Sequence, residues 1–207
     1  MKAGSETRVV DAQFIAGAVD DASLPPPTTV EIAFAGRSNV GKSSLLNVTM
    51  QRNGLARTSK TPGCTRQINV YEVRCQDGLV VRFIDLPGYG WAQRSKAEKV
   101  KWQQMIESYL KKRASLRAVV VIVDVRRGVE DEERQLVDFL HQPREVSSAK
   151  PVSVILVATK VDKLAGAARK PALEAVKKGA GVKPVGFSGE TGEGGEELWE
   201  RIRAAVL

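Results

Sequence analysis

The segment from Gly36 to Ser43 has the residue types and spacing of a loop that binds phosphate. It reads Gly-Arg-Ser-Asn-Val-Gly-Lys-Ser, follows an apolar run from Val30 to Ala35, and precedes a helical pattern that opens at Ser44. In this strand–loop–helix context, backbone N–H groups and the positive end of the helix attract phosphate oxygens. We therefore expect Lys42 to neutralise the β- and γ-phosphates of a nucleotide and the Ser43 hydroxyl to bind Mg²⁺.

A second motif, Asp85-Leu-Pro-Gly88, ends a predicted strand downstream of the phosphate loop. Its aspartate can hold Mg²⁺ through water, and the N–H of Gly88 can meet a γ-phosphate oxygen. For such a motif alone, an Asx-type turn capped by Pro-Gly is an equally good interpretation. Its place at a strand end, after a phosphate loop, favours the nucleotide role.

Two further loops carry groups that can recognise a guanine base. In Thr159-Lys-Val-Asp162 the carboxylate can accept hydrogen bonds from guanine N1–H and the 2-amino group, whereas adenine would leave it buried and unpaired. The Lys160 stem can pack on the base, and a helix N-cap by Asp162 is the alternative. In Phe187-Ser-Gly189 the Ser188 hydroxyl can brace Asp162 and the next N–H can meet guanine O6, although ordinary turn chemistry also explains this segment.

The polar loop from Thr58 to Thr65 lies where a mobile switch would cover the γ-phosphate. Thr65 is the candidate for a second Mg²⁺ ligand that binds only with a triphosphate present, and Thr61 is its competitor. An ordinary solvated connection is the alternative.

The elements that must position these loops alternate between strands and helices. We predict strands at 31–35, 67–74, 80–85, 118–124, 152–158 and 183–187, and helices from Ser44 and at 95–113, 130–142, 166–178 and 195–206. This alternation predicts an α/β fold, a six-stranded and mostly parallel sheet with helices on both faces. Asp77-Gly78 is a hairpin signal, so one antiparallel edge strand is expected. We expect an N-terminal arm over 1–27, partly helical around Phe14 and Ile15, and a single domain over 28–207.

The composition is that of a globular protein with an excess of basic residues. Of 207 residues, 43% are hydrophobic and 27% are charged, and the net charge is +8. The N-terminus lacks the apolar core of a signal peptide, the longest apolar runs are too short to cross a bilayer, and two cysteines imply no disulfide framework. We expect a cytoplasmic protein with no membrane partner. The charge favours a polyanion such as nucleic acid, although a solvated helix face of mixed charge is the alternative.

The order of these motifs resembles the TrmE–Era–EngA-type GTPases and, within them, the EngB (YihA/YsxC) family of ribosome-biogenesis GTPases. The likeness is carried by residues 31–45, 61–69, 85–90, 159–163 and 197–199, with Trp102, Tyr109 and Leu110. It implies a Ras-like P-loop fold that binds and slowly hydrolyses GTP. It also implies action on precursors of the large ribosomal subunit, both rRNA and ribosomal proteins, and an indirect need for the protein in septation during cell division. A monomer is the default expectation.

Together, the motifs and the resemblance give the residues expected to contact the nucleotide: Gly36, Arg37, Ser38, Asn39, Val40, Gly41, Lys42, Ser43, Ser44, Gly63, Cys64, Thr65, Asp85, Leu86, Pro87, Gly88, Thr159, Lys160, Val161, Asp162, Phe187, Ser188 and Gly189. The expected Mg²⁺ ligands are Ser43, Thr65 and Asp85, and the candidates for a role in hydrolysis are Lys42, Thr65, Gly88 and Asn39.

Hydrolysis is expected to be slow because Tyr89 stands where Ras-like proteins have a glutamine that positions water. The resemblance offers Asn39 as a ligand for an activating K⁺ ion, with plain loop hydrogen bonding as the alternative. Arg66 or a ribosomal group is the other candidate source of positive charge.

Two residues depart from the commoner GTPase pattern. Thr159 stands where most GTPases have an asparagine, which should weaken the affinity for the nucleotide. Gly189 stands where alanine or serine is commoner, so the backbone N–H is kept but the turn is looser. Two other functions are alternatives to a GTPase switch. An ATP-using P-loop kinase is opposed by Thr159–Asp162 and by the lack of a lid, whereas a nucleotide-gated scaffold at the division machinery stays open.

Overall fold

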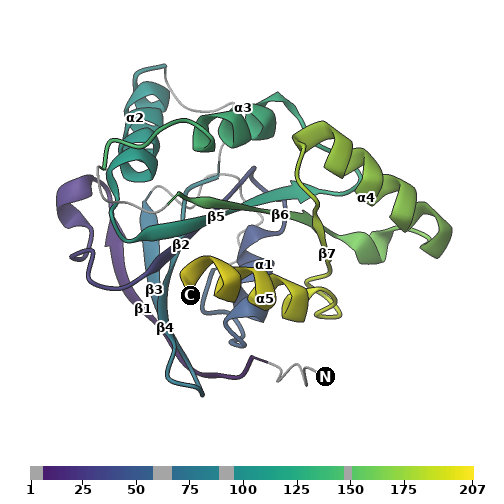
Figure 1. Cartoon of the computed structure of the whole chain (residues 1–207), viewed down its shortest axis with the longest axis horizontal. Helices are drawn as coiled ribbons and strands as arrows, with labels where there is room; N and C mark the ends of the chain where they lie inside the picture. The colour runs from purple at the N-terminus through teal and green to yellow at the C-terminus, as the bar shows by residue number, and fades with distance from the viewer. Residues whose placement is uncertain (1–6, 58–66, 89–95, 147–150) are drawn as a thin grey trace.

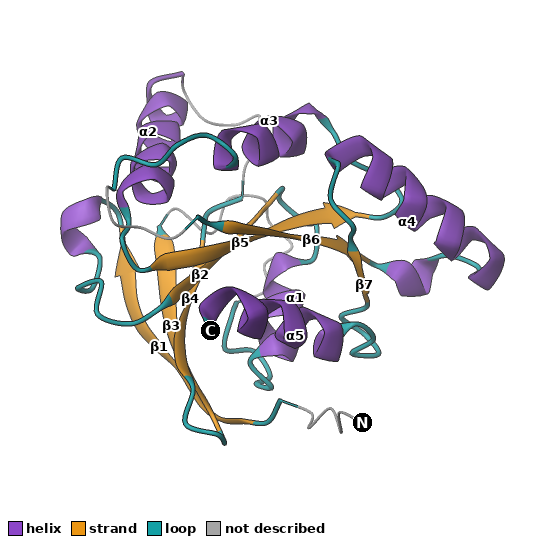
Figure 2. Ribbon diagram, viewed as in Figure 1, coloured by secondary structure: helices purple, strands orange, loops and turns teal. Residues whose placement is uncertain are grey.

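The computed structural model describes residues 7–57, 67–88, 96–146 and 151–207; at Asp21 and over 96–103 it describes the backbone alone. Within these residues a single sheet has seven strands in the order β1-β3-β4-β2-β5-β6-β7 (Figure 2). The strands are β1 (Val9–Ala18), β2 (Glu31–Gly36), β3 (Ile68–Cys75), β4 (Val80–Asp85), β5 (Leu116–Asp124), β6 (Ser153–Thr159) and β7 (Val185–Phe187). The helices are α1 (Lys42–Thr49), α2 (Lys96–Lys112), α3 (Asp131–Leu140), α4 (Gly166–Ala180) and α5 (Gly195–Val206), with short 3₁₀ turns η1 (Asp21–Ser23) and η2 (Val161–Lys163).

The central strands are buried on both faces, as their unbroken apolar sequences predict. In β5, Val120 and Ile122 belong to the core beneath α1 and α5, whereas Val119 and Val121 belong to the core beneath α2, α3 and α4 (Figure 1). From β4 through β2, β5 and β6 to β7, all neighbouring strands are parallel. The predicted α/β fold with helices on both faces is therefore confirmed.

The edge of the sheet differs from the prediction. β3 is antiparallel to β4, as the Asp77-Gly78 hairpin predicted, but β3 is not the edge because β1 pairs with its other side. The sheet consequently has seven strands rather than six, and residues around Phe14 and Ile15 are a strand rather than a helix. Two register shifts, between Val9 and Asp11 and between Phe14 and Ala16, explain the error. A bulge adds a residue and so breaks the two-residue alternation by which a strand is recognised.

A buried ionic network joins the start of β2 to α2. Glu31 is fully buried and accepts hydrogen bonds from Tyr109 Oη at 2.8 Å, Arg113 Nε at 2.9 Å and Arg113 Nη2 at 2.6 Å. Burying a carboxylate is tolerable here because its oxygens are paired with charged and hydroxyl donors. Tyr109 and Leu110 are thus core residues, whereas the side chain of Trp102 lies outside the described residues.

Candidate functional site

The predicted loops meet at the carboxyl ends of the parallel strands, where ligands of open α/β sheets bind. Gly88 packs against the phosphate loop so closely that a Cβ at this position would lie 3.2 Å from Ser38 N and 3.3 Å from Gly36 O. A Cβ at Gly189 would lie 2.9 Å from Ser44 Cβ, so the loop after β7 also packs tightly on α1. Glycine at these two positions permits a close approach that a side chain would obstruct. Segments far apart in the sequence thus form one site.

The phosphate loop leads into α1, whose first turn is capped by no side chain. The first N–H groups of a helix need external partners, and a bound phosphate supplies them. Lys42 is buried and forms an ion pair with the buried Asp85, whose other oxygen lies 3.4 Å from Asn69 Nδ2. The motifs that the sequence assigned to phosphate and to Mg²⁺ are therefore in direct contact.

The donor set fits an Mg²⁺ ion held together with phosphate. Asp85 and Ser43 offer a carboxylate and a hydroxyl, the hard oxygen donors that Mg²⁺ prefers. Within the described part of the chain no three His, Cys, Asp or Glu side chains are grouped as a metal site. Mg²⁺ commonly takes few ligands from protein and the rest from water and phosphate.

Thr159 joins the end of β6 to the phosphate loop. Its side chain is buried, and Oγ1 lies 2.6 Å from Val40 O and 2.9 Å from Val123 O. A hydroxyl has one hydrogen, so it donates to one of these two carbonyls at a time. The threonine that departs from the commoner asparagine therefore still links the base-recognition segment to the phosphate loop.

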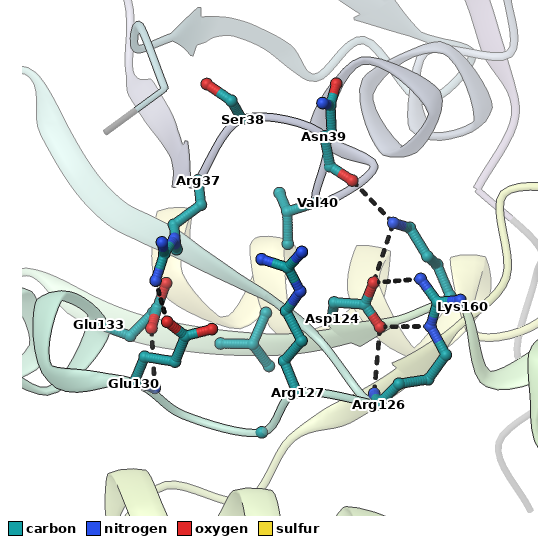
Figure 3. A pocket seen from close by; sticks show the side chains of 12 residues that line it. Arg37, Ser38, Asn39, Val40, Asp124, Arg126, Arg127, Glu130, Glu133 and Lys160 are labelled. Carbon is teal, nitrogen blue, oxygen red and sulfur yellow. Dashed lines mark hydrogen bonds and ion pairs between the residues drawn. The ribbon is translucent and has the colours of Figure 1, made fainter. Parts of the chain in front are cut away.

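Lys160 bridges the phosphate loop and β5. Its backbone is in the left-handed region (φ 63°, ψ 31°), and Nζ lies 2.7 Å from Asn39 O and 2.9 Å from Asp124 Oδ2 (Figure 3). Asp124 also receives Arg126 Nε at 2.9 Å and Nη2 at 2.6 Å. Burial raises the pKa of the Asp124 carboxyl, but these hydrogen bonds outweigh burial and hold that pKa well below its ordinary value. The sequence analysis did not include Asp124 in the site, although a lone aspartate at the end of an apolar strand is a signal of a functional carboxylate.

Asp162 lies in η2, in the segment predicted to read guanine. It caps neither η2, whose N-cap is Lys160, nor α4, whose N-cap is Ala165, so the structure does not bear out the helix-cap alternative. Its Oδ2 atom lies 3.0 Å from Lys163 Nζ, yet this oxygen accepts no hydrogen bond of ordinary geometry from the described residues. The ammonium of Lys163 and then the Ser188 hydroxyl hold the pKa of Asp162 below its ordinary value. The carboxylate is therefore charged at neutral pH, as a guanine acceptor must be.

Ser188 and its neighbours bring the loop after β7 to Asp162. Ser188 is fully buried, and its Oγ accepts hydrogen bonds from the N–H groups of Glu190 and Thr191, each at 3.2 Å. Lys163 Nζ also lies 2.6 Å from Glu190 Oε2, so one ammonium joins the two loops expected around the base. This Lys163 contact was not foreseen, because it links loops that are distant in sequence.

Arg37 and Asn39 differ in how their side chains are used. The Arg37 guanidinium forms an ion pair with Glu130 and lies 3.5 Å from Glu132 Oε2, so it joins the phosphate loop to the start of α3 (Figure 3). Asn39 is exposed, has a φ of 64°, and its side-chain amide bonds to none of the described residues. Plain loop hydrogen bonding, the alternative for Asn39, is therefore not seen in this part of the chain.

Several predicted residues lie outside the described part of the chain, and their roles stay predictions: Thr61, Gly63, Cys64, Thr65, Arg66 and Tyr89. No helix among the described residues has the length and apolar character needed to span a membrane.

Fold and site together define a P-loop GTPase of the Ras-like type. Residues 31–160 match the family described as 50S ribosome-binding GTPase. The fold is also that of a crystal structure of a probable GTP-binding protein EngB, with a TM-score of 0.64, 24% identity, and coverage of 86% of this chain and 98% of that one.

Similar sequences agree with this class. The chain is 42% identical to the probable GTP-binding protein EngB of Desulfatibacillum aliphaticivorans, over 94% of this chain and 91% of that protein. It is 45% identical to the protein of the same description from Myxococcus xanthus, over 83% and 81% of the two chains. The chain belongs to the EngB family of GTP-binding proteins, which confirms the resemblance seen in its motifs.

Proposed function

We propose that the chain is a GTP-dependent switch that acts in assembly of the large ribosomal subunit, and that its effect on septation is indirect. The proposal that the chain binds a nucleotide rests on one observation: the phosphate loop directly contacts two other predicted motifs. These are the motif with Asp85 and Gly88 and the motif with Thr159 and Lys160. The family's description as ribosome-binding and the net charge of +8 support an RNA-containing partner.

In this proposal the phosphate end of the site changes partners when nucleotide binds. The N–H groups of the phosphate loop and of the first turn of α1 receive the phosphates, with Lys42 leaving Asp85 for the β- and γ-oxygens. Asp85, freed of Lys42, and Ser43 would hold Mg²⁺, joined by Thr65 when a triphosphate is bound. A bound Mg²⁺ neutralises developing charge on the phosphates. The N–H of Gly88 would meet the γ-phosphate.

At the base end, Asp162 would accept from guanine N1–H and the 2-amino group. Ser188 would orient the carboxylate, Gly189 N–H would meet O6, and the Lys160 stem would cover the base. The remaining described contacts would act mainly through backbone and packing: Gly36, Arg37, Ser38, Val40, Gly41, Ser44, Leu86, Pro87, Val161 and Phe187.

We expect intrinsic hydrolysis on the order of 10⁻⁴–10⁻² s⁻¹, because Tyr89 cannot position water as a glutamine does. Asn39, whose amide is uncommitted to the described residues, would be available to a K⁺ ion beside the phosphates. Turnover that is faster in potassium than in sodium, and lost in Asn39→Ala, would support this; equal rates in both salts would exclude it. We further propose a cytoplasmic monomer with a single G domain over 28–207, to whose sheet the 1–27 segment adds β1.

Base recognition is tested by equilibrium binding of fluorescent GDP, GTP and ATP analogues in Mg²⁺, with wild type, Asp162→Asn and Asp131→Asn compared. Asp131 is a control for the same chemical change because its side chain is 81% exposed on α3. We expect guanine nucleotides to be preferred over ATP by about 10⁴-fold, with the preference lost only in Asp162→Asn. Comparable ATP binding by wild type, or an unchanged preference in Asp162→Asn, would contradict the assignment.

The ribosomal role is tested by sedimentation of cell extracts. Comigration with large-subunit precursors in a non-hydrolysable GTP analogue but not in GDP is expected. Association with particles in neither state would favour the scaffold alternative.

A further inference from the structure

Asp124 is a buried carboxylate that none of the nucleotide motifs includes. It ends β5, and its side chain is 5% exposed. Its two oxygens receive Lys160 Nζ at 2.9 Å, Arg126 Nε at 2.9 Å, Arg126 Nη2 at 2.6 Å and the Arg126 backbone N–H at 3.1 Å. A buried anion is stable only when its lone pairs are used in this way.

The two cations around Asp124 are not equivalent. The Arg126 side chain is 48% exposed and, among the described residues, bonds within the site only to Asp124, whereas the Lys160 side chain is 28% exposed and also donates to the phosphate loop at Asn39 O, 2.7 Å away (Figure 3). The ammonium of Lys160 therefore sits between one carboxylate and one loop carbonyl. Through these two acceptors the Lys160 ammonium connects the end of β5 to the phosphate loop.

We propose that Asp124 is a positioning residue for guanine-nucleotide binding, which it affects through Lys160. This inference rests on the proposed role of Lys160 in covering the base. In this proposal Asp124 acts on the nucleotide only through the Lys160 side chain. It holds the ammonium, so that the lysine stem and the Asn39 carbonyl keep one arrangement before nucleotide arrives.

The physical gain is pre-organisation. A lysine side chain loses up to about 2 kcal/mol of conformational entropy when it becomes fixed. Because the contact with Asp124 fixes Lys160 during folding, that cost does not fall on nucleotide binding. Without the negative charge, the ammonium would keep only the Asn39 carbonyl, and the stem would move more freely.

The test is a double-mutant cycle of Asp124→Asn with Lys160→Met, read out as GDP affinity and GDP dissociation rate. Asparagine keeps the size of Asp124 without its charge, and methionine keeps an apolar stem without the ammonium. Loss of a charge-assisted contact predicts about tenfold weaker GDP binding for Asp124→Asn, through faster dissociation. In the Lys160→Met background the same change should alter affinity by less than about twofold, since the coupled pair is already broken.

A merely structural role would weaken binding equally in both backgrounds, and that result would overturn the inference. Wild-type affinity in Asp124→Asn would overturn it as well. Thermal unfolding of each variant without nucleotide identifies loss of fold. Asp124→Glu, which keeps the charge but displaces it, supplies a second variant expected to lose affinity only when Lys160 is present. If the wild-type protein failed to bind guanine nucleotides, by contrast, that result would refute the proposed function itself.

Discussion

Replacing Thr159 by valine removes a single hydroxyl from the joint between β6 and the phosphate loop. The side chain is 2% exposed, and its oxygen lies 2.6 Å from Val40 O and 2.9 Å from Val123 O. Valine has nearly the same shape, so no cavity forms, but a buried carbonyl loses its donor. An unsatisfied buried acceptor costs about 1–3 kcal/mol, and we take about 2 kcal/mol. In a domain of this size each kcal/mol shifts the midpoint by about 2–4 °C, so Tm should fall by about 6 °C.

The same substitution should weaken nucleotide binding, because the Val40 carbonyl belongs to the phosphate loop. If half of the loss, about 1 kcal/mol, appears as poorer pre-organisation, GDP affinity falls by about fivefold. Thermal unfolding without nucleotide and dissociation of fluorescent GDP measure the two effects separately. Thr159→Ser is the matched control, since it keeps the hydroxyl and removes only the methyl group. A valine variant as stable and as tight-binding as wild type, or a serine variant as weak as the valine one, would refute the reasoning.

Two further predictions concern stability. Tyr109→Phe should lower the free energy of unfolding by about 2 kcal/mol, because it removes the hydroxyl donor that lies 2.8 Å from the buried Glu31 carboxylate and leaves Arg113 as that carboxylate's partner. Urea unfolding measures this loss. An unchanged midpoint would mean that the hydroxyl contributes nothing to stability. Because the pKa of Asp124 is lower in the folded protein, its contribution is complete above the ordinary value of 3.8 and is lost as the pH falls below it. Wild type should therefore lose more stability than Asp124→Asn on acidification from about pH 5 to about pH 2.5, and parallel losses would contradict the assigned direction.

The fold and the main loops could be predicted because their signals are local. The apolar run of β5, for example, is buried on both faces and needs no knowledge of its neighbours to be recognised as a central strand. The phosphate loop is likewise a contiguous sequence whose function follows from its own backbone and its flanking elements. Strand ends then place the other loops, since ligands bind at the carboxyl edge.

The features that were missed depend on contacts between distant segments or on irregular backbone. β1 was missed because its bulges at Val10 and Ile15 destroy alternation and leave apolar side chains exposed, 52% and 38% respectively. The contact between Lys160 and Asp124 joins two strand ends, and that between Arg37 and Glu130 joins the phosphate loop to α3. No spacing rule along the chain predicts such pairs, because the sheet order, not the sequence, makes them neighbours.

The two ends of the site are held in physically different ways. At the base end, Thr159 and Lys160 bond to carbonyls of the phosphate loop, and these contacts need not break when a nucleotide enters. At the phosphate end, Lys42 pairs with Asp85, and in the proposed function phosphate and Mg²⁺ would compete for both partners. A buried ion pair is costly to break unless new charges replace it. In the proposed function the base end therefore supplies specificity from a preformed arrangement, whereas the phosphate end couples binding to a rearrangement, as a switch requires.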